Sequence, residues 1–228
     1  MARLATKATR EPVTRERAIR VAVALADSGG IDSLSMRKLA GELGVEAMSL
    51  YYHVRNKDEL LDGMVGLVVS EMAIPVADAA WKPALRERSE SARDVLKRHP
   101  WAISQVDARS TVETLNYLNA TIGCLVGAGF SIPLAAHAMS LLDSYVHGFA
   151  LQEASLPLDE AGDIGAVTED ILAQQAMMSG AFPHLATMAT ELILQPGYAY
   201  GNEFAFGLGI IVDGIEASLA AASAPLDQ

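Results

Sequence analysis

The side chains best suited to acid–base chemistry are histidines, and one of them, His147, follows Asp143 by one helical turn. Such a pair could share a helix face and move protons. A catalytic site also needs a nucleophile with its base, or metal-ligand spacing, and no such pattern surrounds this pair or the scattered His99, His137 and His184. A helical enzyme using His147 and Asp143 is therefore the weaker alternative, and neither a catalytic residue nor a metal site is predicted.

Composition narrows the class of protein. The 228 residues include one cysteine, Cys124, which excludes an internal disulfide framework and indicates a cytoplasmic protein. Hydrophobic residues make up 51% of the chain and charged residues 20%, so most of it is expected to fold. The N-terminus lacks the apolar segment of a secretory signal, and no uncharged stretch approaches the roughly 18–20 residues of a membrane span. We therefore expect no membrane partner.

Charge is divided sharply along the chain. The formal net charge of −11 argues, as an average, against nucleic acid as a partner. Residues 1–57, however, hold ten Lys or Arg against six Asp or Glu, whereas residues 58–228 hold seven against 22. No Lys or Arg follows Arg109. The sequence thus predicts a small basic head on a long acidic body.

Apolar residues recur at helical spacing almost throughout, and no segment alternates as a strand would. The sequence therefore predicts an all-α fold. The predicted helices cover residues 14–29, 35–43, 46–53, 56–75, 81–99, 110–127, 131–155, 165–179 and 203–221.

Three short helices fall within the basic head, and their spacing is typical of a helix-turn-helix. Ala40 is small enough for close helix crossing, Gly44 tolerates the positive φ of the turn, and Leu50 supplies an inward anchor beside Val45. Helix pairs with a glycine turn are common. The coincidence with the cationic part of the chain strengthens the interpretation.

The segment LSMRKLAGELGVEAMSLYYHVRNKDELLDGM, residues 34–64, resembles the DNA-binding segment of the tetracycline-repressor (TetR) family. Three further segments resemble the C-terminal domain of its tetracycline-binding branch: GFSIPLAAHAMSLLDSYVHGFALQE (129–153), FPHL (182–185) and FAFGLGIIVDGIEASL (204–219). The resemblance implies a helix-turn-helix head joined by a linking helix to a larger ligand-binding and dimerisation domain.

This resemblance also predicts where the domains divide. We expect a flexible basic arm at 1–13, the head at 14–56, the linking helix at 57–75, and the sensing and dimerisation domain at 76–228. It further implies a homodimeric, sequence-specific regulator, a repressor released from double-stranded operator DNA by a small-molecule effector. A ligandless architectural DNA-binding protein is the alternative.

The resemblance assigns DNA contacts within the head: Arg37, Ala47, Met48, Ser49, Tyr51, His53 and Lys57. A guanidinium at Arg37 can reach a guanine edge or a phosphate, whereas the hydroxyl and imidazole donors suit the DNA backbone. Ala47 and Met48 replace a Gln and a Pro of the tetracycline-binding branch and can touch a thymine methyl, so a different operator is expected. Of the tyrosine pair, Tyr51 is predicted to face outward and Tyr52 inward.

The middle helices should hold the effector, and the last helix should form the dimer interface. The candidate effector contacts are Trp101, Asn116, Tyr117, Ser144, Tyr145, His147, Phe149, Met177, Met178 and Phe182. The candidate interface residues are Phe204, Gly207, Leu208, Ile211, Gly214 and Ile215.

Tetracycline-binding members hold a drug–magnesium chelate through a His and carboxylate-linked waters. The corresponding positions lie near Gln105–Val106 and Gln152–Glu153, and the His is missing. We therefore expect neither a metal nor a cofactor.

Overall fold

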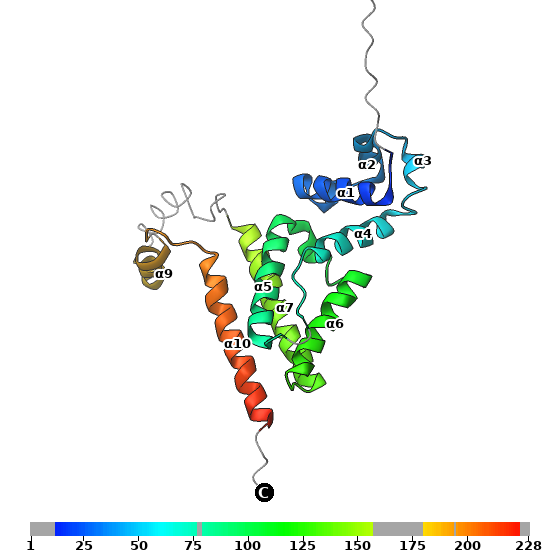
Figure 1. The fold of residues 1–228 in the computed structure, drawn as a ribbon. Coiled ribbons are helices and arrows are strands. Elements are labelled where there is room, and N and C mark those ends of the chain that lie inside the picture. Colours follow the sequence, from blue (N-terminus) through cyan, green and yellow to red (C-terminus); the bar gives the residue numbers. More distant parts are fainter. Residues whose placement is uncertain (1–11, 77–78, 157–179, 194, 224–228) are drawn as a thin grey trace, which may run out of the picture.

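The computed structural model describes residues 12–76, 79–156, 180–193 and 195–223, which form helices and connecting turns without a strand (Figure 1). This confirms the predicted all-α class. The elements are α1 (Arg15–Gly29), η1 (Ile31–Ser33), α2 (Met36–Leu43), α3 (Ala47–Leu50), α4 (Lys57–Ser70), α5 (Trp81–Arg98), η2 (Pro100–Ser104), α6 (Val112–Gly127), α7 (Ile132–Ser155), α9 (Pro183–Met188), the π-helical η3 (Ala189–Ile193) and α10 (Asn202–Ser223). The helix predicted at 165–179 and nearly all of the arm at 1–13 lie outside the described residues.

The head consists of α1, α2 and α3, and its turn has the geometry that the sequence predicts. Ser35 Oγ accepts a hydrogen bond from Lys38 N at 3.2 Å and so begins α2. Gly44 ends this helix in the left-handed region, with φ 69° and ψ 32°. Ala40 and Leu50 are both buried, which brings the two helices of the motif together.

The third helix is shorter than predicted, and the orientation predicted for one tyrosine is wrong. α3 ends at Leu50, and the chain continues through a turn instead of reaching His53 as a helix. Tyr52 follows buried Leu50 by two residues, which at helical spacing places it on the opposite side, and it is 90% exposed, not inward. Val54 fills the inward position, with 1% of its surface exposed.

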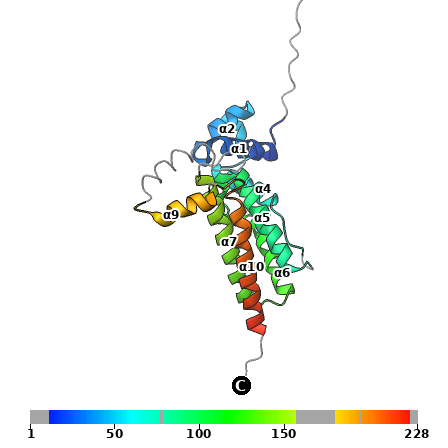
Figure 2. The same ribbon diagram turned by 90° about the vertical axis from the view of Figure 1, so that its left-hand side faces the viewer.

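Helix α4 joins the head to the body (Figure 1). Asn56 caps it, with Oδ1 accepting a hydrogen bond from Glu59 N at 2.8 Å. In the body, α7 packs against α5, α6 and α10, and the long helices run side by side (Figure 2).

An aromatic cluster fastens α10 to α7. The Tyr145 hydroxyl donates to the carbonyls of Glu203 and Phe204, at 3.2 and 3.1 Å, and its ring stacks on Phe204 with centroids 5.3 Å apart. A Cβ at Gly207 would collide with this hydroxyl. Gly207, predicted to allow close approach across a dimer, thus allows close approach within one chain.

Two sides of α10 are apolar, which the sequence analysis did not anticipate. Among the described helices, α10 alone is long and apolar enough for a membrane span, with a mean hydropathy of 1.6 over an 18-residue window of which 22% is buried. Phe204, Leu208 and Ile215 face the core of their own chain, whereas Phe206 and Ile210 are 70% and 60% exposed. The buried side explains part of the hydropathy, and the exposed side needs another explanation.

Two glycines of the motif should respond in opposite ways to a methyl group. Gly44→Ala places an L-residue at φ 69° and should lower the free energy of unfolding by about 1–2 kcal/mol. Gly41→Ala lies inside α2, where an added Cβ meets nothing within 4 Å, and should raise it by up to about 1 kcal/mol. Equilibrium urea unfolding measures both, and shifts of the same sign would contradict the assigned turn.

Candidate functional site

The first candidate site is the outer surface of the head. Arg37, Met48, Ser49, Tyr51 and Lys57 are all exposed there, and Met48 and Tyr51 expose 74% and 42% of their surface. They come from α2, α3, the turn after α3 and the first residue of α4. The structure thus exposes most of the predicted DNA-contacting residues.

The remaining members are less exposed, and one neighbour was missed. Ala47 and His53 are half-buried. Tyr52 is exposed beside them, and its ring can stack on a sugar or contact a phosphate through its hydroxyl. The Tyr-Tyr pair in the sequence was the available signal, and the structure exposes both rings.

Two cations of this surface have no carboxylate partner in the part of the chain that the structure describes. Neither Arg37 nor Lys57 forms an ion pair there, whereas the nearby Arg55 is bound to Glu59, with Nε 3.2 Å from Oε2. Lys57 also begins α4, where the helix dipole favours an anion. This arrangement leaves two positive charges available for phosphates.

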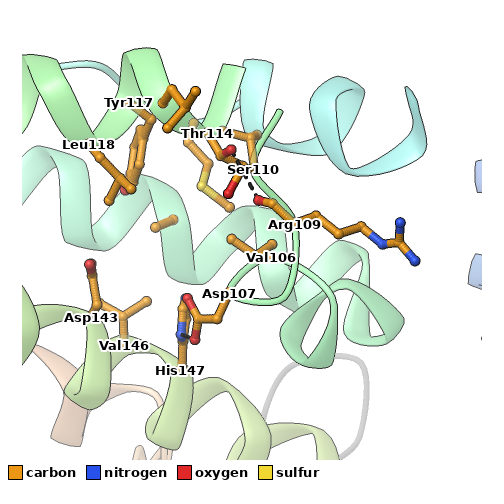
Figure 3. Close-up of a pocket in the computed structure, with 14 residues that line it drawn as sticks. Val106, Asp107, Arg109, Ser110, Thr114, Tyr117, Leu118, Asp143, Val146 and His147 are labelled. Carbon is orange, nitrogen blue, oxygen red and sulfur yellow. Dashed lines mark hydrogen bonds and ion pairs between the residues drawn. The ribbon is translucent and has the colours of Figure 1, made fainter. Parts of the chain in front are cut away.

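The second candidate site is a cavity of about 140 Å³ enclosed by α4, α5, α6, α7 and the loop after η2 (Figure 3). Its lining residues are Val69, Met72, Ala92, Val106, Asp107, Arg109, Ser110, Thr114, Leu115, Tyr117, Leu118, Asp143, Val146 and His147. The walls are largely apolar with a few polar groups, which is the usual make-up of a small-molecule site.

Of the predicted effector contacts, Tyr117 and His147 line this cavity. Tyr145 and Phe149 lie in the aromatic cluster, where their ring centroids are 6.0 Å apart. The others lie elsewhere: Asn116 and Ser144 are exposed, Phe182 is 48% exposed at the start of α9, Trp101 contacts the head, and Met177 and Met178 are outside the described residues. The apolar lining residues that were missed have the types of any helical core, so the sequence carried no signal for them.

The acid–base pair proposed as the enzymatic alternative does not form. His147 Nδ1 lies 3.0 Å from Asp107 Oδ2, whereas Asp143 Oδ1 accepts from Arg88 Nη2 at 2.8 Å. The partner of His147 is Asp107, which lies 40 residues away in sequence. Asp107 lies in a loop, so helical spacing could not predict the contact. The structure therefore contradicts a site that couples His147 to Asp143.

A buried polar contact lies beside the cavity. The Arg88 guanidinium is 1% exposed and lies over the Tyr117 ring, with Cζ 4.3 Å from the centroid. Its Nε donates to Thr121 Oγ1 at 2.9 Å. Burial raises the pKa of Tyr117 to about 12, so its hydroxyl keeps its proton at neutral pH.

The loop that lines the cavity also touches α4. Arg109 extends away from the cavity in Figure 3, and its Nη1 lies 2.6 Å from Asp62 Oδ1. Its Nη2 lies 3.6 Å from Asp58 Oδ1. The contact between Asp107 and His147 holds the same loop to α7. A molecule bound in the cavity would therefore contact the same loop that is paired with α4, the helix that carries the head.

A second contact joins the head to the body. Asp27, near the end of α1, accepts from Trp101 Nε1 at 2.7 Å and lies 2.8 Å from His99 Nδ1. His99 Nε2 is 3.5 Å from Glu71 Oε2, just beyond α4. Trp101, predicted to contact the effector, thus belongs to a contact between head and body.

Glu153, near the position that corresponds to the acidic partner of the tetracycline–magnesium site, is bound to two basic side chains. Glu153 is buried, which opposes ionisation, but hydrogen bonds from Arg93 at 2.7 Å and Lys97 at 3.1 Å lower its pKa. No group of three or more His, Cys, Asp or Glu suited to a metal occurs within the described residues.

Comparison with known proteins identifies both parts. The family model "Bacterial regulatory proteins, tetR family" matches residues 18–64, and "Tetracyclin repressor-like, C-terminal domain" matches residues 74–219. The chain belongs to the TetR family. Such proteins are ligand-responsive, DNA-binding regulators of transcription, generally without enzymatic activity.

Individual TetR-family proteins are similar along most of their length. The HTH-type transcriptional repressor DrrR1 of Streptomyces coeruleorubidus is 29% identical, over 91% of this chain and 79% of its own. The tetracycline repressor protein class A from transposon 1721 of Escherichia coli is 31% identical, over 86% and 88%. The crystal structure of ActR from Streptomyces coelicolor in complex with actinorhodin aligns with a TM-score of 0.71 and 29% identity, covering 92% of this chain and 99% of that one.

Removing the carboxylate that joins head and body should destabilise the protein. Asp27→Ala leaves the donors of buried His99 and Trp101 without this acceptor, and should lower the free energy of unfolding by about 1–3 kcal/mol. The control is Asp32→Ala, which removes an exposed carboxylate from the same head. Urea unfolding measures the difference, and equal stabilities of the two variants would contradict the assigned contact.

Proposed function

We propose that the protein is a homodimeric repressor whose two heads bind double-stranded operator DNA and are released when a small molecule fills the body cavity. One observation carries the proposal. The cavity wall and the linking helix share an ion pair through Arg109, while the head presents cations that no carboxylate within the described residues neutralises. A regulator needs both parts and a connection between them.

The predicted domain division fits this assignment. We assign operator binding to residues 14–56, linkage to 57–75, and sensing and dimerisation to 76–228, with the arm at 1–13 preceding them. Arg37 serves a guanine edge or a phosphate, and Ser49, Tyr51, His53 and Lys57 position the head on the DNA backbone. Ala47 and Met48 contact the base edges through apolar surface.

The release mechanism follows the contacts between the cavity and α4. A molecule that pushes the loop carrying Asp107 and Arg109 displaces Asp58 and Asp62 with it. Because these acids lie in the first turns of α4, the displacement reaches the head. The effector needs only to prefer one head position, and a coupling of about 1–3 kcal/mol changes operator affinity by roughly 5–150-fold.

A second copy of the chain is the proposed cover for the exposed side of α10. A groove of about 400 Å³ runs between α7 and α10 and is lined by Leu134, His137, Ala138, Leu141, Ile210, Ile211, Gly214, Ile215 and Ser218. Three of the predicted interface residues, Ile211, Gly214 and Ile215, line it. Phe206, one turn before Ile210 on α10, adds to this exposed apolar surface. An isologous interface would bury the same surface on both copies.

Relatives indicate what kind of molecule such a cavity takes. The similar ActR has been crystallised with actinorhodin, a small molecule. We infer by analogy that this chain also responds to a small organic molecule in the cytoplasm, where operator DNA is found. A cavity that binds no molecule would instead favour the architectural alternative.

Operator binding should depend on Arg37. With a duplex from the region upstream of its own gene, Arg37→Ala should weaken binding about 5- to 100-fold in fluorescence anisotropy. If Arg37 contacts a phosphate, the loss should be uniform across sequences, and the slope of log K against log salt should fall by about 1. If it contacts a guanine, one base position should lose specificity instead.

The matched control is Arg86→Ala, because Arg86 lies on α5 beside Asp213 and far along the chain from the head. It should leave operator binding unchanged. Wild-type binding no tighter than to random DNA would contradict a sequence-specific regulator and favour the architectural protein.

A charge on the exposed side of α10 should separate the dimer. Ile210→Asp would bury a carboxylate in an apolar interface, and sedimentation should then show a monomer. Val126→Asp introduces the same charge at a 41% exposed position on α6 and should leave the dimer intact. A dimer that persists in Ile210→Asp would contradict the proposed interface.

A further inference from the structure

Several polar side-chain atoms at and beside the cavity are buried without a hydrogen-bond partner. Within the described residues these include Arg88 Nη1, the Tyr117 hydroxyl and Arg109 Nε, and the first two belong to neighbouring side chains. A buried polar group without a partner destabilises the folded state, so proteins seldom retain one without a use. The direct contact between Arg88 and Tyr117 makes their two atoms one feature.

The charge of Arg88 is already balanced by a carboxylate, and Nη1 is the guanidinium nitrogen that still has no hydrogen-bond acceptor within the described residues. Its Nη2 lies 2.8 Å from Asp143 Oδ1, and its Nε is bound to Thr121. The guanidinium lies against the Tyr117 ring, and both Tyr117 and Asp143 line the cavity. What this side offers a ligand is therefore a directed N–H or O–H donor and not a net positive charge.

Tyr117 lines the cavity, and its hydroxyl lies just beneath the cavity surface. The residue is 7% exposed, and Figure 3 shows its hydroxyl directed toward the side of the cavity where Asp143 lies. With a pKa of about 12, the phenol stays protonated at neutral pH and can donate. Its complement is an acceptor oxygen on the ligand.

The other wall groups restrict the kind of acceptor. The charged groups of the wall already contact one another or a neighbour: Asp143 is paired with Arg88, Asp107 contacts His147, and Arg109 is paired with Asp62. A charged ligand would therefore find no unpaired opposite charge among them. Val69, Met72 and Leu118 supply apolar surface around them. Neutral chemistry fits this combination best.

We propose that the cavity selects a neutral carbonyl compound with an apolar ring, whose carbonyl oxygen accepts a hydrogen bond from the Tyr117 hydroxyl, with Arg88 Nη1 as the adjacent donor. The inference rests on the proposed function, since it takes this cavity to be the effector site. It adds the chemical class of the effector and the residue that recognises it.

The test compares three probes that share one ring system: 1-indanone, indane and indane-1-carboxylate. Ligand-observed NMR titration of the full chain measures each dissociation constant. The wild-type protein should bind 1-indanone about 3- to 10-fold more tightly than indane, the effect of one net hydrogen bond, and more tightly than the carboxylate. Equal binding of ketone and hydrocarbon, or tighter binding of the carboxylate, would overturn the proposal.

Two variants separate recognition from structure. Tyr117→Phe removes a hydroxyl that has no partner in the protein, so the preference for the ketone should vanish while the melting temperature does not fall. Tyr145→Phe removes a hydroxyl that binds two carbonyls outside the cavity, so the melting temperature should fall while the ketone preference persists. A ketone preference that survives Tyr117→Phe would overturn the assignment.

The probe measurements need no DNA and are therefore independent of regulation. Wild-type protein that prefers the ketone but fails to bind its operator would contradict the proposed function and support the chemistry of the cavity. Wild-type protein that binds its operator but shows no ketone preference would do the reverse.

Discussion

Arg109 is the last Lys or Arg of the chain, and its ion pair with α4 is the contact through which we propose that the body communicates with the head. The Arg109 side chain is 17% exposed, but Asp62 and Asp58 are 52% and 85% exposed, so water and salt screen these ion pairs much as they screen surface pairs. Arg109 and its neighbours Asp107 and Ser110 line the cavity. Since Asp107 ties the same loop to α7, the loop has defined positions on both sides and can transmit a displacement instead of absorbing it.

The contacts at the two ends of α4 differ. At the body end, Glu71 lies beside His99, which with Trp101 also holds Asp27 of α1. At the head end, Arg109 holds the first turns of α4. We propose that movement of the loop shifts the first turns of α4 relative to its body end, while the Asp27 contact holds α1 to the body.

Periodicity and capping residues predicted the long helices of the described residues and the helix-turn-helix, because these features depend on neighbours in sequence, whereas the short α9 and η3 were missed. The cavity depends on which helix faces meet. Only Tyr117 and His147 among the predicted contacts line it, and Trp101 proved to contact the head. The stripe of Phe204, Leu208 and Ile215 was a correct apolar face, but packing against α7 assigns it to the core of its own chain. When a helix has two apolar sides, its sequence does not show which side packs in its own chain and which side is left for a partner.

The division of charge along the sequence persists in three dimensions, and it explains how an acidic protein can bind DNA. Each of the seven basic residues of the body lies within 4.0 Å of a carboxylate: Lys82, Arg86, Arg88, Arg93, Lys97, Arg98 and Arg109. In the head, Arg37 and Lys57 lack such a neighbour within the described residues. Phosphates are therefore repelled by the body and attracted by one surface of the head. Net charge sets the sign of the average field, whereas the pairing of individual cations decides where DNA can bind.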